Sequence, residues 1–173
     1  MAAEHVYRVS AWWTSGRTGL AKCGSVPNAI HFSEPVERGG LEGRWTPGQL
    51  LLCALAGSFT TTFQTVAHSA KFEYTDLEVE VEAIVNKSKF ECTFSKIVLC
   101  PTLTVQSDED IEEGMGLLRR AQSLCMISRA ISVRQVVEPK VEVRRMPPGG
   151  WVAEAPLKLE VGVSKCRKER GRS

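Results

Sequence analysis

The chain has 173 residues and a mass of 19.1 kDa, which suits one compact domain. Its hydrophobic share of 43% and charged share of 24% exclude a disordered or fibrous protein. The net charge is +2, but residues 165–172 hold five basic residues and one acid, so the rest of the chain carries 17 basic and 19 acidic residues. A mildly acidic body predicts no nucleic-acid partner, and the basic tail is typical of a solvated chain end.

The first 30 residues carry no apolar signal region, so we expect a cytoplasmic protein whose cysteines are thiols. No C-x-x-C pair occurs, and none of the three histidines stands at ligand spacing from a cysteine, so we expect no metal. We also expect no cofactor. The six cysteines are Cys23, Cys53, Cys92, Cys100, Cys125 and Cys166.

Residues 5–13 read as a strand, and the glycines of the stretch 15–19 predict a tight turn after it. Short apolar runs over 20–32 predict further strands. Residues 33–44 are loop-like because they contain Pro35 and the pair Gly39-Gly40.

A helix is predicted over 46–70, with Thr46 as N-cap, Pro47 at the first position and Gln49 completing a capping box. The segment has no charged residue, but its polar side chains argue against a membrane span. These side chains are Gln49, Ser58, Thr60, Thr61, Thr62, Gln64, His68 and Ser69. We therefore expect a helix buried on most sides, in part by a second subunit.

Residues 72–87 and 90–105 alternate in polarity and predict an antiparallel pair joined around 86–89. Within this pair Cys92 and Cys100 are interpreted as packing residues. Residues 107–110 predict the start of a second helix because their acids suit its positive end. Its apolar side is expected at Ile111, Met115, Leu118 and either Ala121 or Gln122.

A short helix is predicted over 125–131 and another strand over 133–145. We place one domain at 1–145. Residues 146–173 form a C-terminal extension with a predicted strand at 151–163 and a basic tail at 164–173.

Cys125 is the cysteine with a candidate chemical role. A thiol at a helix start meets unpaired backbone N–H groups, which lower its pKa, and Arg129 lies one turn further on. The alternative is an inert cysteine at an element boundary. Ser58 follows Gly57 without a G-x-S-x-G elbow, so the sequence does not support a hydrolase.

Four segments together resemble the OsmC/Ohr family of osmotically inducible and organic hydroperoxide resistance proteins. They are the arginine loop at 14–19, the stretch Gly39-Gly40 with 46–51, the residues 54–58, and the segment 121–130 around Cys125. The resemblance runs from about residue 5 to residue 145.

The resemblance implies an α+β fold in which curved antiparallel sheets wrap two central helices of an intertwined homodimer. It implies thiol-dependent reduction of small apolar hydroperoxides by a cysteine pair, reopened by a dithiol reductant. Cys125 takes the resolving position and Arg17 the place of the family's arginine.

Two positions depart from the family pattern. Ser58 stands where the attacking cysteine is expected, and Gly48 where a glutamate orients the arginine. Cys53 lies about 140° around the helix from Ser58 and does not simply replace it.

Two hypotheses follow from these departures. One is a peroxidase that uses Cys125 alone or with another thiol. The other is a non-catalytic binding protein for a small apolar or acyl ligand on the same dimer scaffold. A third interpretation, contact of the basic tail with an acidic partner, ranks last.

Overall fold

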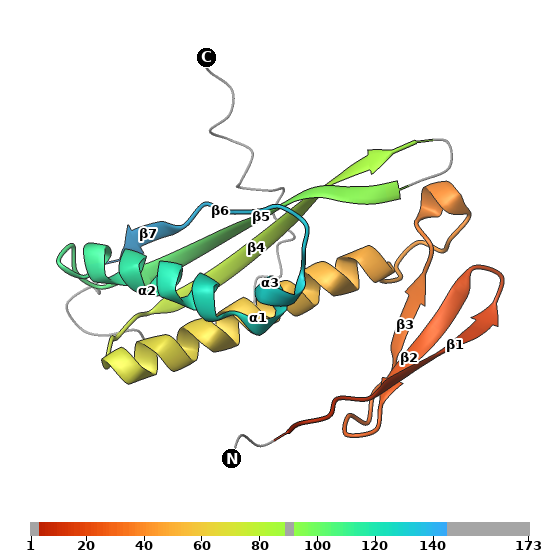
Figure 1. Cartoon of the computed structure of the whole chain (residues 1–173), viewed down its shortest axis with the longest axis horizontal. Coiled ribbons are helices and arrows are strands. Elements are labelled where there is room, and N and C mark those ends of the chain that lie inside the picture. The colour runs from red at the N-terminus through yellow and green to blue at the C-terminus, as the bar shows by residue number, and fades with distance from the viewer. Residues whose placement is uncertain (1–3, 89–91, 145–173) are drawn as a thin grey trace. The chain divides into compact units, whose positions relative to one another are not determined.

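The computed structural model describes residues 4–88 and 92–144. It divides the chain into two compact units, one ending at Leu52 and the other beginning at Cys53. The α+β class is confirmed, since strands and helices occur in both sequence halves (Figure 1). The predicted strand at 151–163 and the basic tail lie outside the described residues.

The first unit contains a three-stranded antiparallel sheet in the order β1-β2-β3. Strand β1 spans Val9–Ser15, β2 spans Thr18–Cys23 and β3 spans Ile30–Ser33, so the predicted first strand begins later than expected. Gly16 makes the β1–β2 turn with a φ of 52°, a conformation that glycine adopts without strain. A 3-10 helix, η1 (Val36–Arg38), lies in the predicted loop.

Helix α1 (Pro47–Ala70) begins with the predicted capping box. The Thr46 N–H donates to Gln49 Oε1 at 2.9 Å, and the Gln49 N–H donates to Thr46 Oγ1 at 3.3 Å. The helix ends at Ala70, the next residue Lys71 has a φ of 56°, and the Phe72 N–H donates to the carbonyl of Ala67 at 3.0 Å. Both predicted boundaries are therefore correct.

Within its own chain, α1 is buried on one face, and the prediction that a second subunit covers the rest stays a prediction. Its buried residues recur at the spacing of a single helix face; they are Leu55, Phe59, Phe63, Val66 and Ala67. The opposite face, which includes Gly57, Thr61 and Gln64, is exposed.

Among the described helices, α1 alone has the length and composition to cross a membrane, with a mean hydropathy of 1.4. Core helices of soluble proteins pass the same test. The hydroxyl groups of Thr60, Thr61, Thr62, Thr65 and Ser69 donate to backbone carbonyls three or four residues earlier. These hydroxyl groups have partners within the helix and would need none in a lipid bilayer. The argument against a membrane span therefore rests on Gln64 and His68.

The second unit contains a four-stranded sheet. Strands β4 (Asp76–Lys87) and β5 (Cys92–Val105) form the predicted antiparallel pair. Strands β6 (Gln135–Val137) and β7 (Lys140–Val143) both pair with β5 in parallel, so the expectation of purely antiparallel sheets is wrong here.

The single strand predicted over 133–145 is two strands because Pro139 lies between them. Proline has no N–H to continue a ladder. The preceding Glu138 N–H still donates to the Leu99 carbonyl at 2.8 Å. The chain then resumes pairing further along β5.

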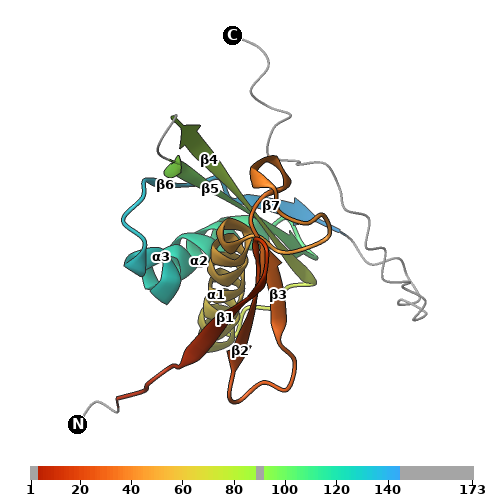
Figure 2. The ribbon, with the colours of Figure 1, turned by 90° about the vertical axis from the view of Figure 1, so that its right-hand side faces the viewer.

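Helices α2 (Asp110–Leu124) and α3 (Met126–Ala130) follow β5. Helix α2 and the part of α1 in this unit lie on the same face of the sheet (Figures 1 and 2). The core between them is apolar; its fully buried residues include Phe59, Phe63, Ile97, Leu99, Leu103 and Leu118.

Three side-chain predictions need correction. Ile111, expected on the apolar side of α2, is exposed, and Gly114 and Leu117 are buried there instead. Cys92, expected to pack, is also exposed. Cys100 is half-buried in β5 and is disulfide-bonded, so the expectation of thiols throughout does not hold for it.

Candidate functional site

Cys125 lies at the junction between α2 and α3, as the sequence predicts. Its φ of −61° and ψ of 115° are extended, so the chain changes direction there and restarts as a helix. The Cys125 N–H donates to the Ala121 carbonyl at 2.9 Å, and its own carbonyl accepts from the Arg129 N–H at 3.1 Å. The residue is 0% exposed, so the thiol at the junction of the two helices is fully buried.

The thiol of Cys125 points at Ser58 on α1. Its Sγ donates a hydrogen bond to Ser58 Oγ at 3.3 Å. Both residues belong to the second compact unit. Ser58 is half-buried one position before the fully buried Phe59, and its own carbonyl accepts from the Thr62 hydroxyl at 2.7 Å. The contact between positions 58 and 125 that the resemblance implies is present, as a thiol–hydroxyl pair.

Gln135, which the sequence analysis missed, fixes α3 to strand β6. Its Nε2 donates to the carbonyls of Ser128 at 2.8 Å and Ile131 at 3.1 Å, and the Ser128 hydroxyl donates to its Oε1. These bonds satisfy carbonyls at the end of a helix too short to be stable alone. The sequence signal for this role was the side-chain amide of Gln135 within an otherwise apolar strand pattern. Arg129, on the same helix, is exposed.

Arg17 belongs to the first unit, at the turn between β1 and β2. Its carbonyl accepts two hydrogen bonds, from the Glu34 N–H at 3.0 Å and from the Ser33 hydroxyl at 3.3 Å. Ser33 is fully buried and also accepts from the Leu41 N–H at 2.8 Å. The Arg17 turn and the segment after β3 are thus tied together through their backbones.

The pair Gly39-Gly40 lets the loop close on this turn. A Cβ on Gly40 would lie 1.6 Å from the Glu34 carbonyl oxygen, which is impossible. Gly39 has a φ of 80°, and a Cβ there would lie 3.5 Å from Cδ and Nε of Arg17. The glycine pair is therefore needed for the loop that carries Glu34, because Gly40 has no room for a Cβ and the positive φ of Gly39 strains other residues.

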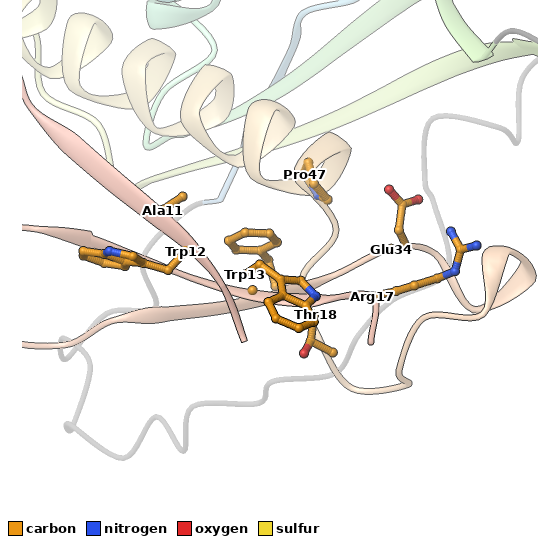
Figure 3. Close-up of a pocket in the computed structure, with 9 residues that line it drawn as sticks. Ala11, Trp12, Trp13, Arg17, Thr18, Glu34 and Pro47 are labelled. Atoms are coloured by element: carbon orange, nitrogen blue, oxygen red, sulfur yellow. The ribbon is translucent and has the colours of Figure 1, made fainter. Parts of the chain in front are cut away.

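A cavity of about 370 Å³ opens beside this turn, within the first unit. Figure 3 shows the Arg17 and Glu34 side chains together at one end and Trp12 at the other. We call it the indole pocket; its lining includes Trp12, Trp13, Arg17, Phe32, Glu34 and Pro47. Sequence reasoning found Arg17 but missed Glu34 and both tryptophans, because distant segments line the pocket.

The remaining candidates do not extend the site. Gly48 brings no side chain to the first turn of α1, and Cys53 is an exposed free thiol. No cluster of three or more potential metal ligands occurs within residues 4–88 and 92–144. Cys23 in β2 was not singled out from sequence. Hydrogen bonds from the Ser25 side chain and backbone lower the pKa of the Cys23 thiol.

Comparisons with known proteins identify the family. Residues 40–142 match the family described as OsmC-like protein. The uncharacterized protein YmaD of Bacillus subtilis (strain 168) is 31% identical over 132 residues, which are 75% of this chain and 88% of YmaD.

Solved structures show the same fold. An organic hydroperoxide resistance protein OsmC from Legionella pneumophila superposes with a TM-score of 0.64 at 23% identity, covering 81% of this chain and 100% of that one. An OsmC-like protein of unknown function from Vibrio cholerae superposes with a TM-score of 0.68 at 16% identity, covering 79% and 99%.

Proposed function

The chain belongs to the OsmC-like protein family, and on this premise we propose that it reduces organic hydroperoxides through the thiol of Cys125. The observation that carries the proposal is the 3.3 Å hydrogen bond between Cys125 and Ser58. The resemblance implies two thiols at these positions, and the proposal rests on the one thiol that this chain has there. The similarity to a solved organic hydroperoxide resistance protein supports the substrate class.

The proposed reaction uses a single protein thiol. The Cys125 thiolate attacks the outer peroxide oxygen, the O–O bond breaks, and the alcohol leaves with a proton while Cys125 becomes a sulfenic acid. An external dithiol then attacks the sulfenic sulfur, water leaves, and the second thiol of the reductant releases Cys125 as the reductant becomes a disulfide. Ser58 cannot form that disulfide, because a hydroxyl is no thiol.

Within this proposal Ser58 and Arg17 have supporting roles. The Ser58 hydroxyl is placed to hydrogen-bond the sulfur in its thiol form and, by rotation, in its thiolate form. For Arg17, a catalytic role stays a prediction that the family pattern implies.

Three proteins test the reaction: the wild type, Ser58→Cys and Cys125→Ser, each with cumene hydroperoxide and dithiothreitol. Peroxide consumption by the wild type that is lost in Cys125→Ser supports the proposal. If only Ser58→Cys consumes peroxide, the natural chain keeps the scaffold without the chemistry, and the proposal is wrong.

A second candidate function is binding of a small apolar or acyl ligand without catalysis. The indole pocket favours it, because a cavity of about 370 Å³ with aromatic walls falls in the range of roughly 300–1,000 Å³ for small-molecule sites. Native mass spectrometry after gentle purification should then show a retained ligand. A clean apo protein that binds no fatty compound argues against this candidate.

We further propose that the protein is a cytoplasmic homodimer. The exposed face of α1 and several exposed apolar side chains in the first unit support a second copy as the covering surface. Outside the indole pocket, these side chains include Val9, Ile30, Leu41 and Trp45. Covering them with an identical chain is the commonest solution for soluble proteins.

A further inference from the structure

We propose that the indole pocket selects uncharged apolar ligands and that Glu34 excludes free carboxylates from it. The proposal rests on the proposed function in one respect, namely that the chain takes an apolar small molecule as substrate or as bound ligand. Its evidence lies entirely within the first unit.

The walls of the pocket suit an apolar group. Gly19 pairs with Trp13 on one side and with Phe32 on the other, so the three positions form one row across the sheet. A Cβ on Gly19 would lie 2.3 Å from the Phe32 ring, which means that this ring occupies the space above the glycine. Phe32 and Trp13 therefore present ring surface to the cavity, and Ala11 leaves room beside them.

One end of the pocket carries two opposite charges. Arg17 and Glu34 both line the cavity, and Figure 3 shows their charged ends on the same side of it. The two backbones are held side by side, because the Glu34 N–H donates to the Arg17 carbonyl at 3.0 Å. Any ligand head group that reaches this end meets the guanidinium and the carboxylate together.

This pairing determines which head group is accepted. A guanidinium alone favours a carboxylate ligand, as in bidentate arginine pairs. Beside Glu34 such a ligand meets a like charge, whereas an alcohol, amide or hydroperoxide accepts from Arg17 and donates to Glu34. The pocket is therefore matched to short uncharged molecules with one terminal group that both donates and accepts hydrogen bonds.

The test is a calorimetric titration at neutral pH with 1-octanol, octanamide and octanoate, which share one chain length. Both the wild type and Cys125→Ser should bind the two neutral compounds at least about tenfold more tightly than octanoate, a ratio worth about 1.4 kcal/mol. In Glu34→Gln the octanoate affinity should rise until this gap closes. In Arg17→Gln octanoate should bind more weakly still.

A matched pair of variants locates the site. Ala11→Trp fills the cavity and should abolish binding. Val9→Trp introduces the same side chain two positions earlier on the same strand face, outside the lining, and should leave affinity unchanged. Circular dichroism checks that both fold, and Trp13→Ala gives a second disruption if Ala11→Trp does not.

Three results overturn the inference. They are octanoate binding as tightly as octanol, unchanged affinity in folded Ala11→Trp or Trp13→Ala, and no binding of any compound, which would mean that a second copy of the chain occupies the pocket. A wild type that binds the two neutral compounds with this selectivity but consumes no hydroperoxide contradicts the proposed reaction alone.

Discussion

The thiol of Cys125 donates a hydrogen bond to the hydroxyl of Ser58 at 3.3 Å, across 67 positions of sequence. Two helical elements create the contact: α1 carries Ser58, and the break between α2 and α3 turns Cys125 toward it. The pair has the placement of two groups that act together, but one of them cannot be oxidised to a disulfide. Cysteine at position 58 is the smallest change that restores a thiol pair.

Ser58→Cys should form a disulfide with Cys125 when oxidised. A cysteine Sγ in place of Ser58 Oγ starts near 3.3 Å from the other sulfur, and small rotations bring two sulfurs to the bonding distance of about 2.05 Å. Intact mass spectrometry after one equivalent of hydrogen peroxide should show the loss of two hydrogens. The double variant Ser58→Cys, Cys125→Ser is the control, and a bond to another cysteine instead contradicts the geometry.

Ser58→Ala should destabilise the protein relative to a matched serine. It leaves the buried Cys125 thiol without its acceptor, a loss of about 1 kcal/mol for a neutral hydrogen bond. Ser69→Ala on the same helix removes an exposed hydroxyl that bonds only the helix backbone, so helix propensity should make it neutral or stabilising. Urea unfolding measures the free energy of unfolding of both variants. Equal changes would show that the hydrogen bond to the Cys125 thiol contributes no stability.

Gly40→Ala should unfold the loop that holds Arg17 and Glu34. Its Cβ would overlap the Glu34 carbonyl oxygen, and relief by backbone movement should cost about 1–3 kcal/mol. Gly24→Ala in the same unit meets no atom within 4 Å and should change stability by less than about 0.5 kcal/mol. Thermal unfolding followed by tryptophan fluorescence compares them; equal midpoints contradict the role given to the glycine pair.

Gly57→Arg should dissociate the proposed homodimer. Gly57 lies on the exposed face of α1, and no atom stands within 4 Å of a Cβ built there. An arginine at this position therefore fits its own chain but buries an unpaired charge against a partner subunit. Gly116→Arg on α2 places the same side chain at an equally open helical glycine and should leave the assembly intact. Sedimentation gives the mass of each, against 19.1 kDa for one chain. A wild-type monomer would refute the proposal directly.

Cys23 should be alkylated faster near neutral pH than the exposed thiol of Cys92. The Ser25 hydrogen bonds favour the thiolate and lower the pKa of Cys23, so its reactive form persists to lower pH. In Ser25→Ala the midpoint of the iodoacetamide rate against pH should move up, because the side-chain bond is lost. Peptide mass spectrometry resolves the two sites, and an unchanged midpoint argues against Ser25 as the cause.

Local sequence determined the elements around the site. Thr46, Pro47 and Gln49 define where α1 begins because a capping box uses side chains and N–H groups within one turn. Acidic residues at the start of α2 and the break before Cys125 are equally local signals. The resemblance placed position 58 opposite position 125, and their contact in the structure agrees with it.

Tertiary structure decided the features that depend on pairing between distant segments. Parallel addition of β6 and β7 to β5 depends on strand direction, which side-chain alternation does not encode. The exposure of one face of α1 depends on what else packs against it, because an apolar composition is the same whether its own chain or another covers it. Glu34 joined Arg17 at the indole pocket through a backbone hydrogen bond between loops 17 positions apart, a contact that no local pattern specifies.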